Sequence, residues 1–164
     1  MKSQDGQVQL RRMGFRWSKA YAHLEPLQQL RGHMDAPFFD HPEAIAAAMD
    51  VLDRHLAALN SGDAVALAQT LHFPHYRLAG GRMKIWEHPE TYLQDFYARA
   101  GNEWHHSAWD FRNPISSSSD KVHLDVQFSR YRADGSVLGR YRSIWVVSLI
   151  KQRWAAQLRS SFAA

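Results

Sequence analysis

The sequence contains no cysteine and no long apolar run. Without cysteine among its 164 residues, the chain cannot form a disulfide, a thiolate metal site or a cysteine nucleophile. No apolar stretch approaches the ~18 residues that a membrane-spanning helix needs. We therefore expect no membrane partner, and we expect a cytoplasmic protein because a reducing compartment suits a chain without disulfides.

The C-terminal part of the chain also lacks an excess of positive charge, although the whole chain has a formal net charge of +4. Residues 1–33 contain six Lys or Arg and two Asp or Glu, whereas residues 34–164 contain fourteen of each kind. A protein that tracks a phosphate backbone is expected to carry a basic face on its folded domain. The charge distribution therefore predicts no nucleic-acid partner.

This distribution divides the chain into a basic N-terminal extension, residues 1–37, and one globular domain, residues 38–164. Within the extension, residues 18–31 repeat apolar side chains at helical spacing and predict a partial helix. The extension lacks the apolar core of a secretory signal. Three interpretations stay open: a poorly packed segment with Met34 opening the domain, an organelle transit peptide, and an arm that contacts anionic partners.

The first half of the domain has helical patterning. Apolar residues recur every three or four positions from residue 45 to 59 and predict a helix that opens at Pro42. Asn60-Ser61-Gly62-Asp63 is expected to end this helix and to cap a second one, which Pro74 would end.

A short hairpin and a third helix are predicted next. Residues 75–79 and 83–86 can pair across Gly80-Gly81, because consecutive glycines accept the positive φ of a tight turn. Glu87 opens the third helix, whose expected buried side comprises Tyr92, Leu93, Phe96 and Tyr97.

After Gly101 the hydrophobic period changes to two, which predicts strands at about 104–115, 121–132, 137–150 and 153–162. The apolar side of these strands should pack on the helices, because burying each large apolar side chain is worth about 1.5–3 kcal/mol. This inward face is expected to comprise Val122, Leu124, Val126, Phe128, Tyr141, Ser143, Trp145, Val147, Leu149, Trp154, Ala156, Leu158, Ser160 and Phe162.

The outward face is expected to be mainly polar, with Ile144 and Val146 as apolar interruptions. Such a face can be solvated or can meet a second copy across a two-fold axis. Its polar members are expected to be His123, Asp125, Gln127, Ser129, Arg140, Arg142, Gln157 and Arg159.

The order of these elements resembles the nuclear-transport-factor-2-like (NTF2-like) superfamily, which includes the SnoaL-like proteins. The resemblance covers about residues 38–162 and involves the segments 59–63 and 73–78, and the Gly80-Gly81 hairpin that leads into Glu87. It implies an α+β fold in which three N-terminal helices pack on a strongly curved antiparallel sheet to form a cone with a cavity. It also implies a homodimer through the outer sheet face.

Because the superfamily contains isomerases, cyclases, dehydratases and non-catalytic domains, the fold alone does not decide the function. Members resembling steroid isomerases carry a carboxylate base near the end of the first strand, where this chain has Leu78-Ala79-Gly80. The Asp-Arg-Asp arrangement of the epoxide hydrolases has no clear counterpart. Its nearest equivalent is Asp125 with Arg140 or Arg142, which we expect on the outward face.

Histidines are the remaining catalytic candidates, because the histidine pKa lies near neutrality. His75 and His105 facing each other inside the cone would resemble the acid–base pair of the dehydratase-like members, with His105 facing inward beside Ser107, Trp109 and Phe111. The alternative is that His72 ends a helix and His75 satisfies a backbone group. His72 and His75 lie across a proline without a carboxylate at ligand spacing, so no metal site is predicted.

Aromatic side chains supply the candidate ligand-binding residues. They could line a pocket for a small apolar or aromatic molecule, or they could simply fill the core. An inward Arg77 would need an anion or a carboxylate as its partner. The candidate set is Tyr76, Arg77, Trp86, Trp109, Tyr141, Ser143 and Trp145.

We therefore predict an NTF2-like domain that binds a small molecule in an aromatic-lined cavity without a cofactor. Two alternatives stay open. One is a cofactor-independent lyase, isomerase or cyclase that uses His75 and His105, and the other is a non-catalytic protein-interaction module.

Overall fold

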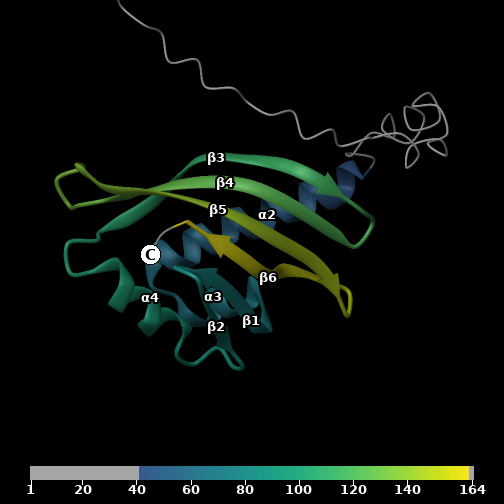
Figure 1. Cartoon of the computed structure of the whole chain (residues 1–164), viewed down its shortest axis with the longest axis horizontal. Helices are drawn as coiled ribbons and strands as arrows, with labels where there is room; N and C mark the ends of the chain where they lie inside the picture. Colours follow the sequence, from purple (N-terminus) through teal and green to yellow (C-terminus); the bar gives the residue numbers. More distant parts are fainter. Residues whose placement is uncertain (1–40, 163–164) are drawn as a thin grey trace, which may run out of the picture. The chain divides into compact units, whose positions relative to one another are not determined.

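The computed structural model describes residues 41–162, so the predicted N-terminal extension and its partial helix lie outside the described residues. Within that range the chain forms three helices and six strands (Figure 1). The helices are α2 (Pro42–Ser61), α3 (Ala64–Gln69) and α4 (Tyr92–Ala100). The strands are β1 (Leu71–Ala79), β2 (Arg82–Trp86), β3 (His106–Ser117), β4 (Lys121–Tyr131), β5 (Val137–Ile150) and β6 (Arg153–Ser161). None of the described helices is both long and apolar enough to cross a membrane.

The junction between α2 and α3 forms as the sequence predicts. Pro42 occupies the first turn of α2, where its missing N–H costs no hydrogen bond. Gly62 ends α2 in the left-handed region at φ 70°. The Asp63 carboxylate then accepts a hydrogen bond of 2.9 Å from the Ala66 N–H and caps α3.

The second helix is shorter than predicted. Helix α3 ends at Gln69, and β1 already begins at Leu71 and continues through Pro74. The cause is pairing with a strand far along the chain: Leu71 lies opposite Ala156 of β6, and the Ala156 N–H donates to the Thr70 carbonyl at 2.9 Å. Tertiary pairing thus overrides the local helical pattern.

The six strands form one mostly antiparallel sheet in the order β2-β1-β6-β5-β4-β3, in which β1 and β6 are parallel. The predicted positions of the last four strands are confirmed to within two residues at every end. The predicted register of β4 and β5 is confirmed as well, because Leu124 lies opposite Trp145 and Phe128 lies opposite Tyr141. The chain therefore has the predicted α+β architecture.

A bulge at Gln157 reverses the predicted sides of β6 from Leu158 onward, whereas Trp154 and Ala156 keep their predicted side. Ala156 and Leu158 are two residues apart but lie opposite neighbouring residues of β5, so Gln157 is the extra residue. Arg159 consequently lies beside Trp145 on the inward face, although the alternation predicts it outward. The predicted inward placement is therefore wrong for Leu158, Ser160 and Phe162, the last of which is 75% exposed.

A second bulge, at Asp110, changes sides within β3. Ser107 is buried and Trp109 packs on the core, as predicted for the inward face. Beyond the bulge Phe111 turns outward, where the Arg142 guanidinium lies 5.8 Å from its ring centroid. The prediction of an inward Phe111 is wrong for this reason.

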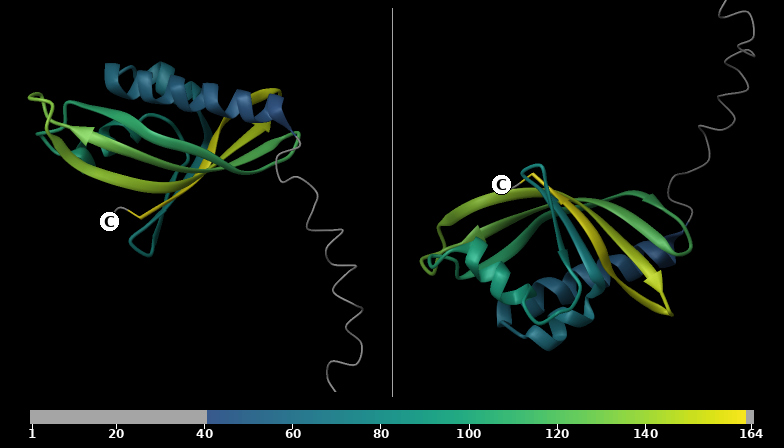
Figure 2. Two further views of the ribbon diagram at one scale, coloured as in Figure 1. Left: turned by 90° about the horizontal axis from the view of Figure 1, so that it is seen from above. Right: turned by 60° about the horizontal axis from the view of Figure 1, so that its bottom comes forward.

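The sheet arches over the helices, with α2 across the concave side of the long strands (Figure 2). The core joins buried residues of α2, such as Leu52, to buried residues of the sheet, such as Leu124 and Trp145. On α4 the predicted burial of Phe96 is confirmed, whereas Tyr97 is 42% exposed.

Candidate functional site

The concave side of the sheet and the helices α2 and α4 enclose a cavity that combines aromatic rings with arginines. The space between the lining side chains is about 30 Å³, room for roughly one or two water molecules. The lining residues include no Asp or Glu, and they are His55, Leu56, Leu59, Arg77, Tyr92, Phe96, Arg99, Ser107, Trp109, Phe128, Arg130, Trp145, Arg159 and Ser161.

Two of the arginines are direct neighbours in the sheet. Arg77 of β1 lies opposite Arg159 of β6, and Arg159 in turn lies opposite Trp145 of β5. Like charges at directly opposite positions of neighbouring strands destabilise a sheet. The repulsion between Arg77 and Arg159 therefore disfavours this pairing of β1 with β6.

The Arg159 side chain is 8% exposed and lies against aromatic rings. Its guanidinium is 5.5 Å from the Trp145 ring centroid and 5.7 Å from that of Tyr92. Guanidinium groups favour such positions over ring faces. The aromatic contacts hold Arg159 but supply no negative charge.

The other two arginines approach from different elements. Arg99 comes from the last turn of α4, and its guanidinium lies 5.4 Å from the Trp86 ring centroid. Arg130 of β4 lies 4.5 Å from the Tyr141 ring centroid and donates from Nη1 to the Arg99 carbonyl at 3.3 Å. Four guanidinium groups from four elements thus meet in one cavity.

None of these four arginines forms an ion pair with a carboxylate of residues 41–162. Three of their nitrogens are buried without a hydrogen-bond partner: Nη2 of Arg99, Nε of Arg130 and Nε of Arg159. Burial, and then repulsion from Arg159, lower the pKa of Arg99 to about 10. The same two causes lower the pKa of Arg77. A pKa of about 10 leaves Arg99 charged at neutral pH.

His55, on the apolar side of α2, is a cavity residue that sequence reasoning missed. Its Nδ1 lies 2.9 Å from the Thr70 Oγ1, and that hydroxyl donates its proton to the Leu67 carbonyl at 2.7 Å. The His55 Nδ1 must therefore carry a proton, which leaves its Nε2 as an acceptor. Burial lowers the pKa of His55 well below its ordinary value, so the ring is neutral at pH 7. Its position three residues after Leu52 in the apolar stripe of α2 is the signal that could have identified it.

The two predicted catalytic histidines do not line this cavity. His75 is fully buried, its Nδ1 lies 3.1 Å from the Ala156 carbonyl, and burial lowers its pKa to about 3. His105 is exposed and contacts the ring of His106, so its predicted inward orientation is wrong. The reason is that His105 precedes β3 and is not held by the alternation of the strand.

The buried contact of His75 with a backbone carbonyl agrees with its structural interpretation. His72, in contrast, does not end a helix but lies in β1, where its Nε2 contacts the Ser148 carbonyl at 3.0 Å. Among the described side chains, no group of three or more His, Asp or Glu is arranged to hold a metal ion.

The candidate ligand-binding residues divide into two sets. Arg77, Trp109 and Trp145 line the cavity. Trp86 is buried outside it and donates its Nε1–H to Asp95 at 2.8 Å. Tyr76, Tyr141 and Ser143 are likewise absent from its walls. Ligand binding by any of these residues stays a prediction.

Comparison with known proteins finds similarity at the level of structure only. No family model and no curated protein sequence matches the chain. An NTF2-like protein with a cystatin-like fold from Novosphingobium aromaticivorans superimposes with a TM-score of 0.61, at 15% identity, over 85% of this chain and 91% of that chain. A protein of unknown function with a cystatin-like fold from Nostoc punctiforme superimposes with a TM-score of 0.60, at 14% identity, over 73% and 90% of the two chains.

A putative ketosteroid isomerase from Shewanella frigidimarina also superimposes, with a TM-score of 0.56 at 14% identity, over 70% of this chain and 94% of that chain. Identities this low show the fold and not the activity. The described domain therefore has an NTF2-like fold, as the order of elements in the sequence indicates.

Proposed function

We propose that this domain is a cytoplasmic, non-catalytic module that binds a small apolar or aromatic molecule in the cavity under the sheet. The observation that carries the proposal is the aromatic lining of an enclosed space between the concave sheet and two helices. Pockets for small molecules are mostly apolar, with few polar groups that set orientation.

The shape of the lining favours a flat ligand. The Trp109 ring meets the Trp145 ring edge-on, with 5.9 Å between centroids, and meets Phe128 edge-on at 6.0 Å. Rings arranged at right angles leave faces and edges for a further ring to contact.

We also propose a homodimer through the outer sheet face. Apolar side chains interrupt the polar surface there, including exposed Ile115 and half-buried Ile144, and they line a groove with Phe162. Contiguous apolar surface of this kind favours association with a second copy.

Native mass spectrometry of protein taken directly from cells tests both proposals. We expect a dimer mass with a co-purified small molecule in each subunit. Trp109→Leu, inside the cavity, should lose that molecule, whereas the matched substitution Trp154→Leu, which packs on the core outside the cavity, should keep it. A bare chain mass, together with no thermal stabilisation by any member of an aromatic compound library, would contradict the binding proposal.

A cofactor-independent lyase or isomerase is the second candidate, and His55 favours it over the predicted pair of His75 and His105. A neutral histidine with an acceptor Nε2 inside the cavity can accept a proton, although burial lowers its pKa well below the ordinary value and makes it a weak base. Turnover of a panel of enolisable and hydroxylated molecules tests this candidate, and the absence of turnover in the whole panel excludes it.

A further inference from the structure

The cavity contains positive charge that the described protein does not neutralise. Arg77, Arg99, Arg130 and Arg159 line it, and no described carboxylate lies within ion-pair distance of any of them. Arg130 and Arg159 are each only 8% exposed. A water molecule can accept a hydrogen bond from a buried guanidinium, but it does not neutralise the charge.

Three of these arginines are placed to act together. Arg77 and Arg159 lie opposite each other on β1 and β6, and Arg99 reaches the same cavity from α4. The three guanidinium groups are also close enough to interact, because repulsion from Arg159 lowers the pKa of both Arg77 and Arg99. Arg130, in contrast, is held by the Tyr141 ring and the Arg99 carbonyl, so it supports the wall.

Guanidinium groups match the geometry of carboxylate and phosphate groups, because their N–H donors form a planar fork. Aromatic rings beside the arginines suit an apolar body attached to such a group. We propose that the ligand of this cavity is a small organic acid, with a carboxylate or phosphate bound by Arg77, Arg99 and Arg159 and a flat apolar body against Trp109 and Trp145. This inference rests on the proposed binding function and adds the chemical class of the ligand.

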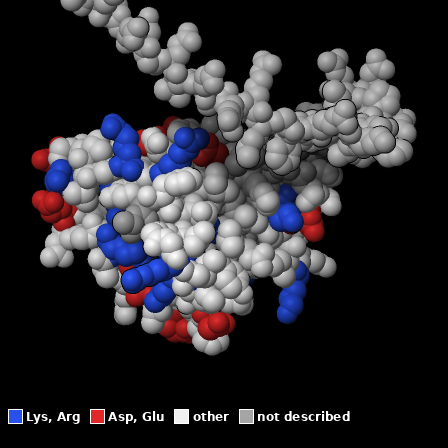
Figure 3. Space-filling view, in the orientation of Figure 1, with Lys and Arg blue, Asp and Glu red and all other residues white. Residues whose placement is uncertain are grey.

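The surface beside the site carries both kinds of charge, since Asp95 of α4 pairs with Lys84 at 3.1 Å. On the face shown in Figure 3, Lys and Arg side chains gather over the part of the domain where α4 lies. Positive potential around a cavity raises the local concentration of anions and speeds their association.

The test uses the full chain and small probes of matched shape, measured by isothermal titration calorimetry at low salt. Benzoate and phenyl phosphate carry the two oxyanion groups, benzyl alcohol is neutral, benzylammonium is cationic, and inorganic phosphate lacks the apolar body. We expect at least one of the two aromatic acids to bind at least tenfold more tightly than benzyl alcohol and benzylammonium. The tighter acid identifies the group that the site prefers.

Substitutions locate the binding in the cavity. Arg159→Met and Arg77→Met should each weaken the aromatic acid at least tenfold. Arg140→Met removes the same charge from an exposed position of β5 and should leave the affinity unchanged. Circular dichroism and thermal unfolding of each variant show whether it is folded, and we expect Arg159→Met to fold because methionine suits an aromatic environment.

Two failures are distinguishable. If benzyl alcohol binds as tightly as the acids and Arg159→Met binds both unchanged, the acidic ligand is excluded while the cavity remains a binding site. If no aromatic probe binds and no molecule co-purifies, the binding function itself is wrong. If inorganic phosphate binds as tightly as phenyl phosphate, the proposal that the ligand has an apolar body is wrong.

Discussion

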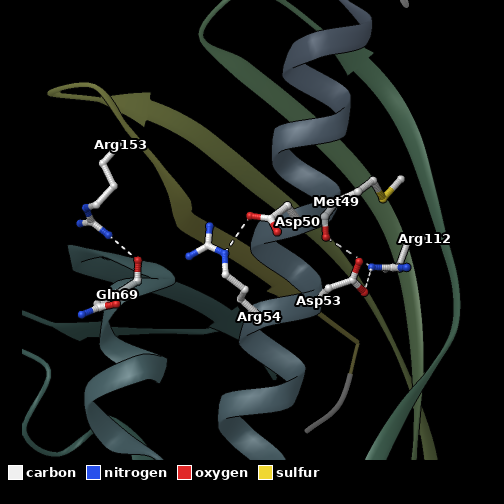
Figure 4. A network of polar contacts seen from close by, with 7 residues as sticks. All are labelled: Met49, Asp50, Asp53, Arg54, Gln69, Arg112 and Arg153. Carbon is white, nitrogen blue, oxygen red and sulfur yellow. Dashed lines mark hydrogen bonds and ion pairs between the residues drawn. The ribbon is translucent and has the colours of Figure 1, made fainter.

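Arginines on the outside of this domain and arginines inside its cavity have opposite surroundings. On the outside, Arg54 pairs with Asp50 at 2.8 Å and Arg112 pairs with Asp53, both along α2 (Figure 4). On the outer sheet face, Arg142 contacts both carboxylate oxygens of Asp125, at 2.9 and 2.6 Å. The cavity arginines have no carboxylate partner among residues 41–162.

This difference matters for stability, because an exposed charge and a buried charge contribute differently to the free energy of folding. An exposed ion pair is worth about 0–1 kcal/mol, and an exposed charge that loses its partner is still hydrated by water. A buried charge without a partner opposes folding, by several kcal/mol when a partner is removed. Among residues 41–162, the exposed arginines Arg54 and Arg142 thus have carboxylate partners, whereas the four arginines of the cavity have none.

The largest expected effect is a loss of stability at low pH, which the buried His75 should cause and the exposed His105 should not. Burial lowers the pKa of His75 to about 3, whereas an unfolded histidine has a pKa of about 6.5. The unfolded chain therefore takes up the proton first, so the contribution of His75 to stability is complete above pH 6.5 and is lost as the pH falls. By pH 5 the loss from His75 should be about 2 kcal/mol.

Urea unfolding at pH 7 and pH 5 measures this effect. His75→Gln should reduce the loss by about the amount attributed to His75 alone, while the exposed His105→Gln should keep the full dependence. Equal losses in the wild type and in His75→Gln would show that His75 already takes up its proton in the folded state.

A smaller effect, of opposite sign, should follow from removing a cavity arginine. Arg159→Met replaces an unpaired buried cation with an apolar side chain between Trp145 and Tyr92. Without ligand, we expect the free energy of unfolding to rise by about 1–2 kcal/mol, because the desolvation cost of the charge disappears. Chemical denaturation measures it, and a decrease would mean that the aromatic contacts already compensate the charge.

The smallest effect should come from the matched change on the outer face. Arg142→Met removes the exposed pair with Asp125 and should lower the free energy of unfolding by no more than about 0.5–1 kcal/mol. The same denaturation experiment, repeated at high salt, should show an even smaller difference because salt screens exposed charges. If Arg142→Met lowers the free energy of unfolding by as much as Arg159→Met raises it, the exposed ion pair matters for stability as much as the buried arginine, and the difference between the two regions is wrong.

Most of the architecture follows from local patterns. The end of α2 at Gly62 and the Asp63 cap follow from residue type, and the register of β4 and β5 follows from strict alternation across a short turn. The NTF2-like order of elements followed from these local interpretations. Local signals succeed here because caps, turns and alternation act over a few residues.

The site was only partly predictable, because its arginines depend on irregular pairing. Arg77 is a candidate from the sequence, but Arg159 enters the cavity only because of the bulge at Gln157. The bulge results from the pairing of β6 with both β5 and β1. No residue type near Gln157 predicts it from the sequence. Arg99 lies in the last turn of α4, where a basic residue already has an ordinary explanation in the helix dipole.

The bulge also determines which of two sets of β6 side chains faces the cavity. With Gln157 as the extra residue, Arg159 and Ser161 point toward the helices. In an uninterrupted strand of the same sequence, Leu158 and Ser160 would take those places and the chamber would be lined with hydrocarbon and a hydroxyl. The position of one extra residue in β6 therefore decides whether this strand contributes a guanidinium or a leucine to the cavity, while Arg77, Arg99 and Arg130 on other elements keep their places.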